Sequence, residues 1–223
     1  MKIFIVIAAY NEEKTIGNVI RDLKSHSYRN IVVVDDGSKD ETAKIVRGNG
    51  ALLLQHIINR GQGAALKTGI DYALKEGADI IITFDADAQH QASDLKELIK
   101  PVANKEIDIA LGSRFLKKNN VPLIRKLFLK GGAFIIYLMY GIRLTDSHNG
   151  LRALSRKAAQ TIDIKSNGME HASEIIDEIK RKKLRYKEIP VEIKYTEYSK
   201  KHGQSSLNAF KILFKMLIKK FIR

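Results

Sequence analysis

The 223-residue sequence predicts an α/β fold in which a parallel, doubly wound sheet is flanked by helices. Short apolar runs rich in β-branched residues alternate with helical patterns as far as residue 113, which is the order typical of β-α-β units. The runs are apolar without alternation, as in strands that are buried on both faces. With 44% hydrophobic residues and no internal repeat or low-complexity linker, the chain can bury one sizeable core.

Five strands separated by helices are expected in the first half, and the first, second and fourth of them are expected to be buried. The strands are 3–9, 31–34, 51–55, 80–84 and 108–113. We expect Asn11 to cap the first helix, with acids in its first turn, and Ser38–Glu41 to form a capping box for the second. A third helix is expected over Ala64–Leu74, and a short fourth helix that begins at Ser93 and ends near Pro101.

The second half is less regular. Val121–Ile142 is apolar apart from a few interspersed basic residues. Its uncharged part, Gly131–Ile142, is too short to span a bilayer, which needs about 20 residues. This segment fits either a buried helix or a helix lying at a membrane interface. The remaining expectations are a strand at Leu151–Leu154, a helix at His171–Lys182 and a half-exposed edge strand at Lys187–Lys194 that carries Pro190.

Composition narrows the class of partner. The formal charge of +14 favours nucleic acid, an acidic membrane surface or phosphorylated substrates. Cysteine is absent, which excludes a disulfide framework and thiolate chemistry and suits a reducing compartment. Residues 2–9 begin directly as a strand and lack the charged segment and cleavage site of a signal peptide, so we expect a cytoplasmic protein.

A pair of acids follows the strand at 80–84. Asp85 and Asp87 are two residues apart, so their side chains would share one side if the backbone stayed extended beyond Phe84. Carboxylates at the carboxyl edge of a sheet suit Mg²⁺ or Mn²⁺, which would complete its coordination with substrate phosphates. Gln89, one alternation further on, could add a carbonyl oxygen. An acidic turn after a strand is the alternative explanation.

Two other turns carry candidate residues. Asp35 and Asp36 end the second strand, where a carboxylate could accept hydrogen bonds from a nucleobase or could form the turn before Gly37. The glycine-punctuated turn Asn59–Ala65 is neither a Walker motif nor a complete Gly-x-Gly-x-x-Gly. It fits close backbone approach to a ligand or a helix, or simply the entry to a helix.

The C-terminal segment 207–223 is the clearest amphipathic helix in the sequence. Its apolar face carries aromatic and aliphatic residues, and Lys211, Lys215 and Lys219 follow one another at i, i+4 spacing on the other face. This profile is typical of a helix that lies on an anionic membrane surface, although docking on the protein's own core would produce it too.

Together these motifs resemble the family-2 glycosyltransferases with a GT-A fold, and more narrowly the polyprenyl-phosphate transferases of the dolichol-phosphate mannose synthase group. A GT-A fold implies a mixed, mostly parallel sheet flanked by helices. The resemblance covers nearly the whole chain. The matching segments are Ala9–Glu13, Val34–Ser38, Asp85–His90 with its Gln-His extension, Gly112–Phe115, Asp146–Arg152 and His202–Ser206.

The resemblance implies inverting transfer of a hexose, mannose or glucose, from a nucleotide sugar to a polyprenyl or dolichyl phosphate. The donor would be GDP-mannose or UDP-glucose. The catalytic domain would span 1–206, with a nucleotide-sugar half at 1–115 and an acceptor half at 116–206, followed by the amphipathic helix. The enzyme would lie peripherally at the cytoplasmic face of the membrane. Whether a partner subunit supplies a membrane span is left open.

The resemblance also implies which residues contact the donor. They are Ala8, Tyr10, Glu12, Asp35, Asp36, Asp85, Ala86, Asp87 and Gln89. Among them, Asp85, Asp87 and Gln89 would hold Mg²⁺ or Mn²⁺ against the donor diphosphate, and Asp87 is counted as catalytic. Ala8 stands where relatives often carry Pro.

The acceptor phosphate is implied to contact Arg114, Arg125 and Lys200, with Arg114 also counted as catalytic. Arginine offers planar, bidentate recognition of phosphate. Lys200 stands where relatives often carry Arg, so it keeps the positive charge but cannot bind a phosphate in the planar, bidentate manner of a guanidinium group. Because a phosphate acceptor is already ionised near neutral pH, no strong general base is required.

Two alternatives to this function are kept. A sugar or protein hydroxyl acceptor would need a base, such as Asp146 or Glu170. A basic nucleic-acid-binding domain is compatible with the charge, but no helix-turn-helix, zinc or RNA-binding signature is present, and acids crowd the strand ends; we expect no nucleic-acid partner. His148 and His171 are not assigned to a metal.

Overall fold

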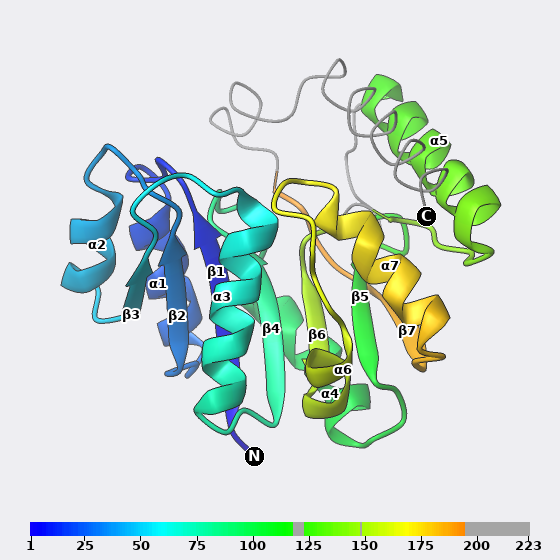
Figure 1. Ribbon diagram of the computed structural model, residues 1–223, viewed down its shortest axis with the longest axis horizontal. Coiled ribbons are helices and arrows are strands. Elements are labelled where there is room, and N and C mark those ends of the chain that lie inside the picture. Colours follow the sequence, from blue (N-terminus) through cyan, green and yellow to red (C-terminus); the bar gives the residue numbers. More distant parts are fainter. Residues whose placement is uncertain (118–122, 148, 195–223) are drawn as a thin grey trace.

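One seven-stranded sheet organises the part of the chain that the computed structural model describes, namely residues 1–117, 123–147 and 149–194. Its strand order is β3-β2-β1-β4-β6-β5-β7 (Figure 1). The strands are β1 (Ile3–Ala9), β2 (Ile31–Asp35), β3 (Leu52–Gln55), β4 (Ile80–Asp85), β5 (Ile109–Ser113), β6 (Arg152–Ser155) and β7 (Tyr186–Pro190). The five strands predicted in the first half are confirmed.

The sheet is mixed because one strand runs against the others. β1, β2, β3 and β4 are mutually parallel, as are β5 and β7, whereas β6 pairs antiparallel with both β4 and β5. The prediction of a mostly parallel sheet is therefore confirmed. β7 lies at the edge of the sheet, as predicted, but its pairing ends at Pro190 and does not reach Lys194.

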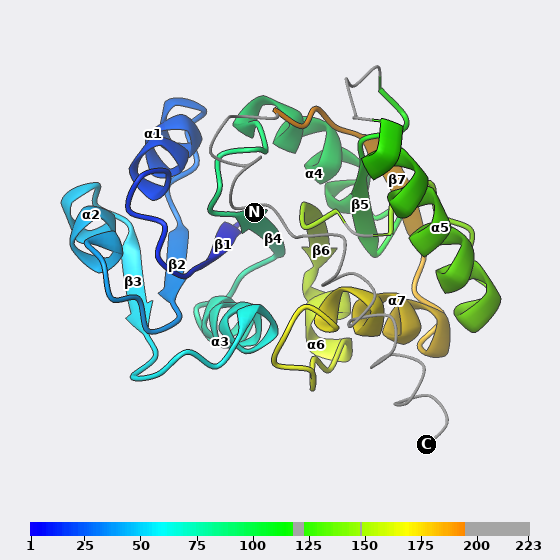
Figure 2. The same cartoon turned by 90° about the horizontal axis from the view of Figure 1, so that it is seen from above.

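Helices cover both faces of the sheet (Figure 2). Apolar side chains of α1, α2 and α4 pack on one face, and those of α3, α6 and α7 on the other. The helices are α1 (Ile16–Ser25), α2 (Thr42–Gly48), α3 (Gln62–Lys75), α4 (Leu95–Ala103) after a 3₁₀ turn (Ala92–Asp94), α5 (Leu123–Tyr140), α6 (Arg156–Thr161) and α7 (His171–Arg181). The inner strands thus have packed neighbours on both faces, which explains their near-continuous apolar sequences, whereas the edge strands β3 and β7 keep exposed positions.

The predicted helix caps are wrong. α1 begins at Ile16, after the acids, and neither α1 nor α2 has a side-chain cap. Asn11 instead has a left-handed backbone (φ 55°) and links two loops: its N–H donates to Ser38 Oγ at 2.8 Å, and its Oδ1 accepts from Lys39 N–H at 2.9 Å. These polar residues join the loop after β1 to the loop after β2, a contact that local pattern does not reveal.

Candidate active site

The site is built where β4 ends. The backbone does not stay extended as expected, because β4 ends at Asp85 and the chain turns through Ala88, which has a left-handed φ of 59°. Asp85 and Asp87 nevertheless interact: burial raises the pKa of Asp87, and the negative charge of Asp85 raises it further. The two carboxylates are brought together by a turn and not by strand alternation.

Asp85 is held on three sides. His90 Nε2 lies 2.9 Å from its Oδ2, and Gln62 Nε2, at the start of α3, donates to its Oδ1 at 3.4 Å. The third side is the backbone of Gly150, where an added Cβ would lie 2.4 Å from both carboxylate oxygens. The side chain remains 28% exposed. Burial opposes ionisation, but the hydrogen bond to His90 and nearby positive charge hold the pKa of Asp85 below its usual value.

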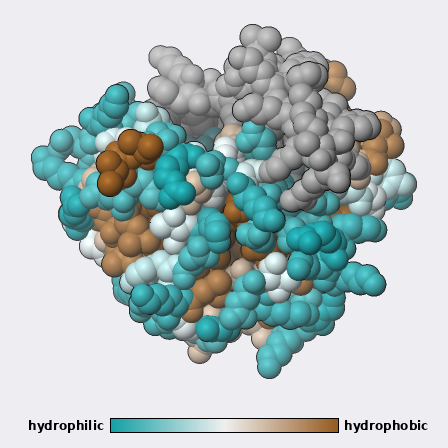
Figure 3. Space-filling model, viewed as in Figure 1, coloured by the Kyte–Doolittle hydropathy of each residue, from teal (hydrophilic) through white to brown (hydrophobic). Residues whose placement is uncertain are grey.

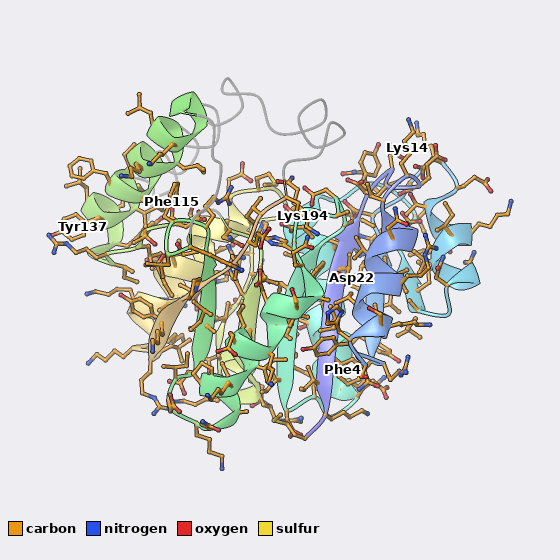
Figure 4. All side chains as sticks on the ribbon, turned by 180° about the vertical axis from the view of Figure 1, so that it is seen from behind. Phe4, Lys14, Asp22, Phe115, Tyr137 and Lys194 are labelled. Atoms are coloured by element: carbon orange, nitrogen blue, oxygen red, sulfur yellow. The ribbon has the colours of Figure 1, made fainter. Side chains whose placement is uncertain are left out.

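Gln89 is engaged by its neighbours. Its backbone N–H donates to Asp87 Oδ1 at 3.1 Å, and its side-chain Nε2 donates to Asp87 Oδ2. Its backbone carbonyl accepts from Lys194 N–H at 2.9 Å, so the chain beyond β7 crosses back to the end of β4 (Figure 4). A metal would need the side-chain carbonyl oxygen of Gln89, which is the atom not used by Asp87.

These residues fit a divalent cation. The two carboxylates provide hard oxygen ligands, Asp85 is partly exposed, and its negative charge raises the pKa of Asp87. A cation bound there would neutralise this negative charge. Among the described residues no cluster of three or more His, Asp or Glu side chains is arranged to hold a metal. Protein ligands alone would leave the coordination incomplete, as is usual for Mg²⁺ that also binds substrate phosphates.

Asp35 and Asp36 both lie in the interior. Asp36 is 2% exposed and accepts hydrogen bonds from Arg60 N–H at 3.0 Å and Gly61 N–H at 2.6 Å, with His56 Nδ1 at 2.6 Å from the same carboxylate. Asp35 accepts from Ser38 N–H at 3.0 Å and from Gln55 Nε2 at 3.2 Å. Both acids therefore build turns in the structure; a contact of either with a nucleobase stays a prediction.

The other residues expected to contact the donor lie at the end of β1 or in the turn after β4. Ala8 pairs with Asp85 across the sheet, and Tyr10 is 44% exposed just beyond the strand. Glu12 Oε2 accepts from Thr15 Oγ1 at 2.7 Å. Ala86 is 4% exposed and packs in the core on the side of α1 and α4, so its backbone is the part that could reach a ligand.

The backbone of the turn Asn59–Ala65 packs closely against another loop of the protein, which contains Ser166 and Asn167. Gly63 N–H donates to Asn167 O at 2.7 Å, and Ala64 N–H donates to the same carbonyl at 3.2 Å. An added Cβ on Gly63 would lie 2.0 Å from the Ser166 carbonyl oxygen. The first N–H groups of α3 are thus used by the protein itself.

On the acceptor side, Arg114 forms a buried ion pair. Its Nε donates to Asp146 Oδ2 at 2.6 Å, and its backbone N–H donates to the same oxygen at 3.1 Å. Asn149 lies beside them, with Nδ2 at 3.5 Å from Asp146 Oδ2. The side chain of Arg125, in α5, and the whole of His148, Lys200 and segment 207–223 lie outside the described part of the chain.

Two further buried side chains, those of Arg152 and His171, act electrostatically on Asp85. Arg152, on β6, is 2% exposed, and its Nη1 has no hydrogen-bond partner among the described residues. Burial lowers the pKa of Arg152 to about 10, against the opposing charges of Asp85 and Asp146. His171, at the start of α7, is also buried, and burial together with the charge of Arg152 lowers its pKa to about 4, so it is neutral near pH 7.

Comparison with known proteins identifies the family. Residues 4–163 match the family model described as glycosyl transferase family 2. The chain belongs to glycosyl transferase family 2. The matched region contains the acids at the end of β4 and the Arg114–Asp146 ion pair, whereas His171 and Lys194 lie beyond it.

Relatives of this glycosyltransferase align along nearly its full length. An uncharacterized protein of Methanocaldococcus jannaschii is 47% identical over 98% of this chain and 92% of its own. UDP-N-acetylglucosamine–dolichyl-phosphate N-acetylglucosaminyltransferase of Methanococcus voltae is 38% identical over 98% of this chain and 96% of its own. Dolichol-phosphate mannosyltransferase of Pyrococcus furiosus is 29% identical over 97% of this chain and 62% of its own.

Solved structures support the GT-A fold. Glucosyl-3-phosphoglycerate synthase from Mycobacterium tuberculosis, in complex with Mn²⁺ and UDP-glucose, superposes with a TM-score of 0.75 at 17% identity, covering 98% of this chain and 78% of that one. At that identity the similarity concerns the fold alone.

Sequence reasoning for this glycosyltransferase missed four residues around Asp85. His90 and Gly150 stood within matched motifs without an assigned role, and Gln62 stood in a glycine turn. Arg152 carried a signal that could have been used, because a lone arginine inside the apolar run Leu151–Leu154 predicts a buried charge with an acidic partner.

Proposed function

We propose that this glycosyltransferase moves a hexose, or a 2-acetamido hexose, from a nucleotide sugar to a polyprenyl phosphate at a membrane surface. The observation that carries the proposal is the pair Asp85 and Asp87 at the end of β4, partly open to solvent and mutually repulsive without a cation. Mg²⁺ or Mn²⁺ held there by Asp85, Asp87 and Gln89 would stabilise the negative charge on the departing nucleoside diphosphate.

The acceptor side supports a phosphate in preference to a hydroxyl acceptor. A hydroxyl needs a base, and Asp146 is a poor candidate because it is 3% exposed and its Oδ2 is bound to Arg114. Arg114 is the residue we assign to the acceptor phosphate, with Arg125 and Lys200 as further candidates. The ion pair with Asp146 fixes the direction of the Arg114 side chain, so its recognition of a phosphate would require little reordering.

Membrane contact is supported by α5. Leu127, Phe134 and Leu138 form one stripe along the helix and are 75%, 60% and 65% exposed, while Ile136 on the opposite side is buried. Lys126 and Lys130 flank the stripe and are exposed. Figure 3 shows apolar side chains at the outer margin of the molecule where α5 lies, and Figure 4 shows Tyr137 on the side of α5 away from the sheet.

The energy of that contact is modest. Burying three such side chains would contribute roughly 3–6 kcal/mol, and each nearby lysine about 1 kcal/mol at an anionic surface. Reversible, salt-sensitive binding is the expected behaviour. None of the helices in the described residues is long and apolar enough to cross a membrane.

The donor can be identified by its effect on stability. We would measure the thermal midpoint with GDP-mannose, UDP-glucose and UDP-N-acetylglucosamine, each with and without Mn²⁺. A donor at about 100 times its dissociation constant stabilises the fold by about 2.7 kcal/mol. UDP-N-acetylglucosamine belongs in the screen because the Methanococcus voltae relative, by its name, uses that donor.

The function itself is tested by transfer of labelled sugar to a short polyprenyl phosphate and, in parallel, to the corresponding polyprenol. Asp87→Ala should abolish metal-dependent transfer, whereas Asp71→Ala, an exposed acid on α3, should leave the rate unchanged. Full activity of Asp87→Ala, or transfer to the alcohol but not to the phosphate, would overturn the proposal.

A further inference from the structure

We infer that Gly150 and Thr83 are positioning residues for Asp85. The bare Cα of Gly150 leaves the space in which the Asp85 carboxylate lies, and the Thr83 hydroxyl holds the Gly150 peptide at that position. The inference rests on the proposed role of Asp85 in metal binding. Both residues act through Asp85.

The contact leaves no room for a side chain. A Cβ added to Gly150 would lie 2.4 Å from Oδ1 and Oδ2 of Asp85 and 2.7 Å from its Cγ. Ordinary contact begins at 3.4 Å, so the carboxylate would have to move by about 1 Å. Gly150 does not have a left-handed φ, so its backbone conformation would accept alanine. The position needs glycine because of Asp85 and not because of its own conformation.

Thr83 holds Gly150 from the neighbouring strand. It lies two residues before Asp85 on β4, so the two side chains emerge on the same face of the sheet. Its Oγ1 donates to the Gly150 carbonyl oxygen at 2.6 Å, at the point where the chain enters β6. Two positions of one strand thus hold the same loop: Thr83 by a hydrogen bond and Asp85 by close packing.

A substitution at Gly150 should spare the fold. The atoms in the way belong to the end of a partly exposed side chain, which can turn toward solvent. Gly63 provides the contrast, because its added Cβ would meet a backbone carbonyl oxygen at 2.0 Å. Gly150→Ala should therefore fold with Asp85 displaced from His90 and Gln62, whereas Gly63→Ala should lose stability.

The test is Mn²⁺ affinity, measured from the electron paramagnetic resonance signal of free Mn²⁺ in the presence of UDP or GDP, whichever stabilises the protein. Substituting a group that orients a metal ligand typically weakens metal binding by about 10- to 100-fold. We expect a loss in this range for Gly150→Ala and a loss of about tenfold for Thr83→Val, with Thr83→Ser restoring affinity. The matched control is Gly48→Ala, where an added Cβ meets nothing within 4 Å.

The outcomes separate the inference from the proposed function. Unchanged Mn²⁺ affinity in both Gly150→Ala and Thr83→Val would overturn the positioning role while the metal site stands. If the unsubstituted protein binds no Mn²⁺ with either nucleotide, the metal assignment fails, and the inference fails with it. Loss of affinity in Thr83→Ser equal to that in Thr83→Val would show that the hydroxyl is not the group responsible and would also overturn the role of Thr83.

Discussion

Asp36 offers a sharp test of whether an acid of the predicted donor site contacts the nucleotide or holds the loop beyond β3. Its carboxylate is almost fully buried and is bound by two backbone N–H groups, of Arg60 and Gly61, and by the ring of His56. Each hydrogen bond to a charged group contributes about 1.5–3 kcal/mol. At the low end these three contacts sum to about 4.5 kcal/mol, within the 3–5 kcal/mol expected when a buried pair loses one partner.

Asp36→Ala should therefore lower the thermal midpoint by about 9–18 °C, because 1 kcal/mol shifts a domain of this size by about 2–4 °C. Asp36→Asn keeps the shape but turns one acceptor into a donor, so it should recover only part of that loss. The control is Asp71→Ala, whose exposed ion pair with Lys67 contributes about 0.5 kcal/mol or less. The measurement is thermal and urea unfolding without nucleotide.

The reasoning fails if Asp36→Ala costs less than about 1 kcal/mol in the absence of nucleotide and yet abolishes stabilisation by the donor. That result would mean that the carboxylate is available to the nucleotide and is not committed to the loop. A large loss of stability with donor stabilisation retained in the surviving folded protein would support the structural role alone.

Two more predictions concern α7 and the membrane. Because the pKa of His171 is about 4 in the folded protein and 6.5 as its ordinary value, the unfolded state binds more protons between these pH values, and stability should fall by up to about 3 kcal/mol as pH decreases through this window. His171→Gln should flatten that slope in pH-dependent unfolding, and an unchanged slope would contradict the assignment. The sequence has no tryptophan, so Phe134→Trp and Lys75→Trp each carry a single emitter. Brominated anionic vesicles should quench Trp at position 134, on α5, and not at position 75, at the end of α3; equal quenching at both positions would contradict an oriented contact.

The strands and their burial could be predicted because they follow from local composition. Ile31–Val34 is apolar at every position and Ile80–Phe84 at every position except Thr83, and the structure buries both runs between two helical layers. The order of motifs was enough to predict the family and the GT-A fold. These features depend on which residues neighbour one another in sequence, which is the information that periodicity contains.

The details of the site could not be predicted in the same way, because they depend on contacts between distant segments. The expected capping residues at Asn11 and Ser38 bind each other's loops instead of their own helices. Asp36 looked available for a nucleobase, yet the loop that satisfies it begins about twenty residues later, at His56. In both cases a polar residue suited to a local turn is used for a long-range hydrogen bond of the same chemistry.

The direction of β6 explains why a single loop serves both halves of the site. A parallel strand between β4 and β5 would enter from the opposite edge of the sheet, whereas the antiparallel β6 begins at the edge where β4 and β5 end. The loop that leads into β6 therefore contacts the ends of both strands. Its Asp146 binds Arg114 at the end of β5, and its Gly150 packs against the Asp85 carboxylate at the end of β4. Asp146, which binds the proposed acceptor arginine, and Gly150, which packs against the proposed metal ligand, thus belong to one loop. A change in that loop should therefore alter metal affinity and acceptor affinity together, while the nucleotide side, built on β1 and β2, is left intact.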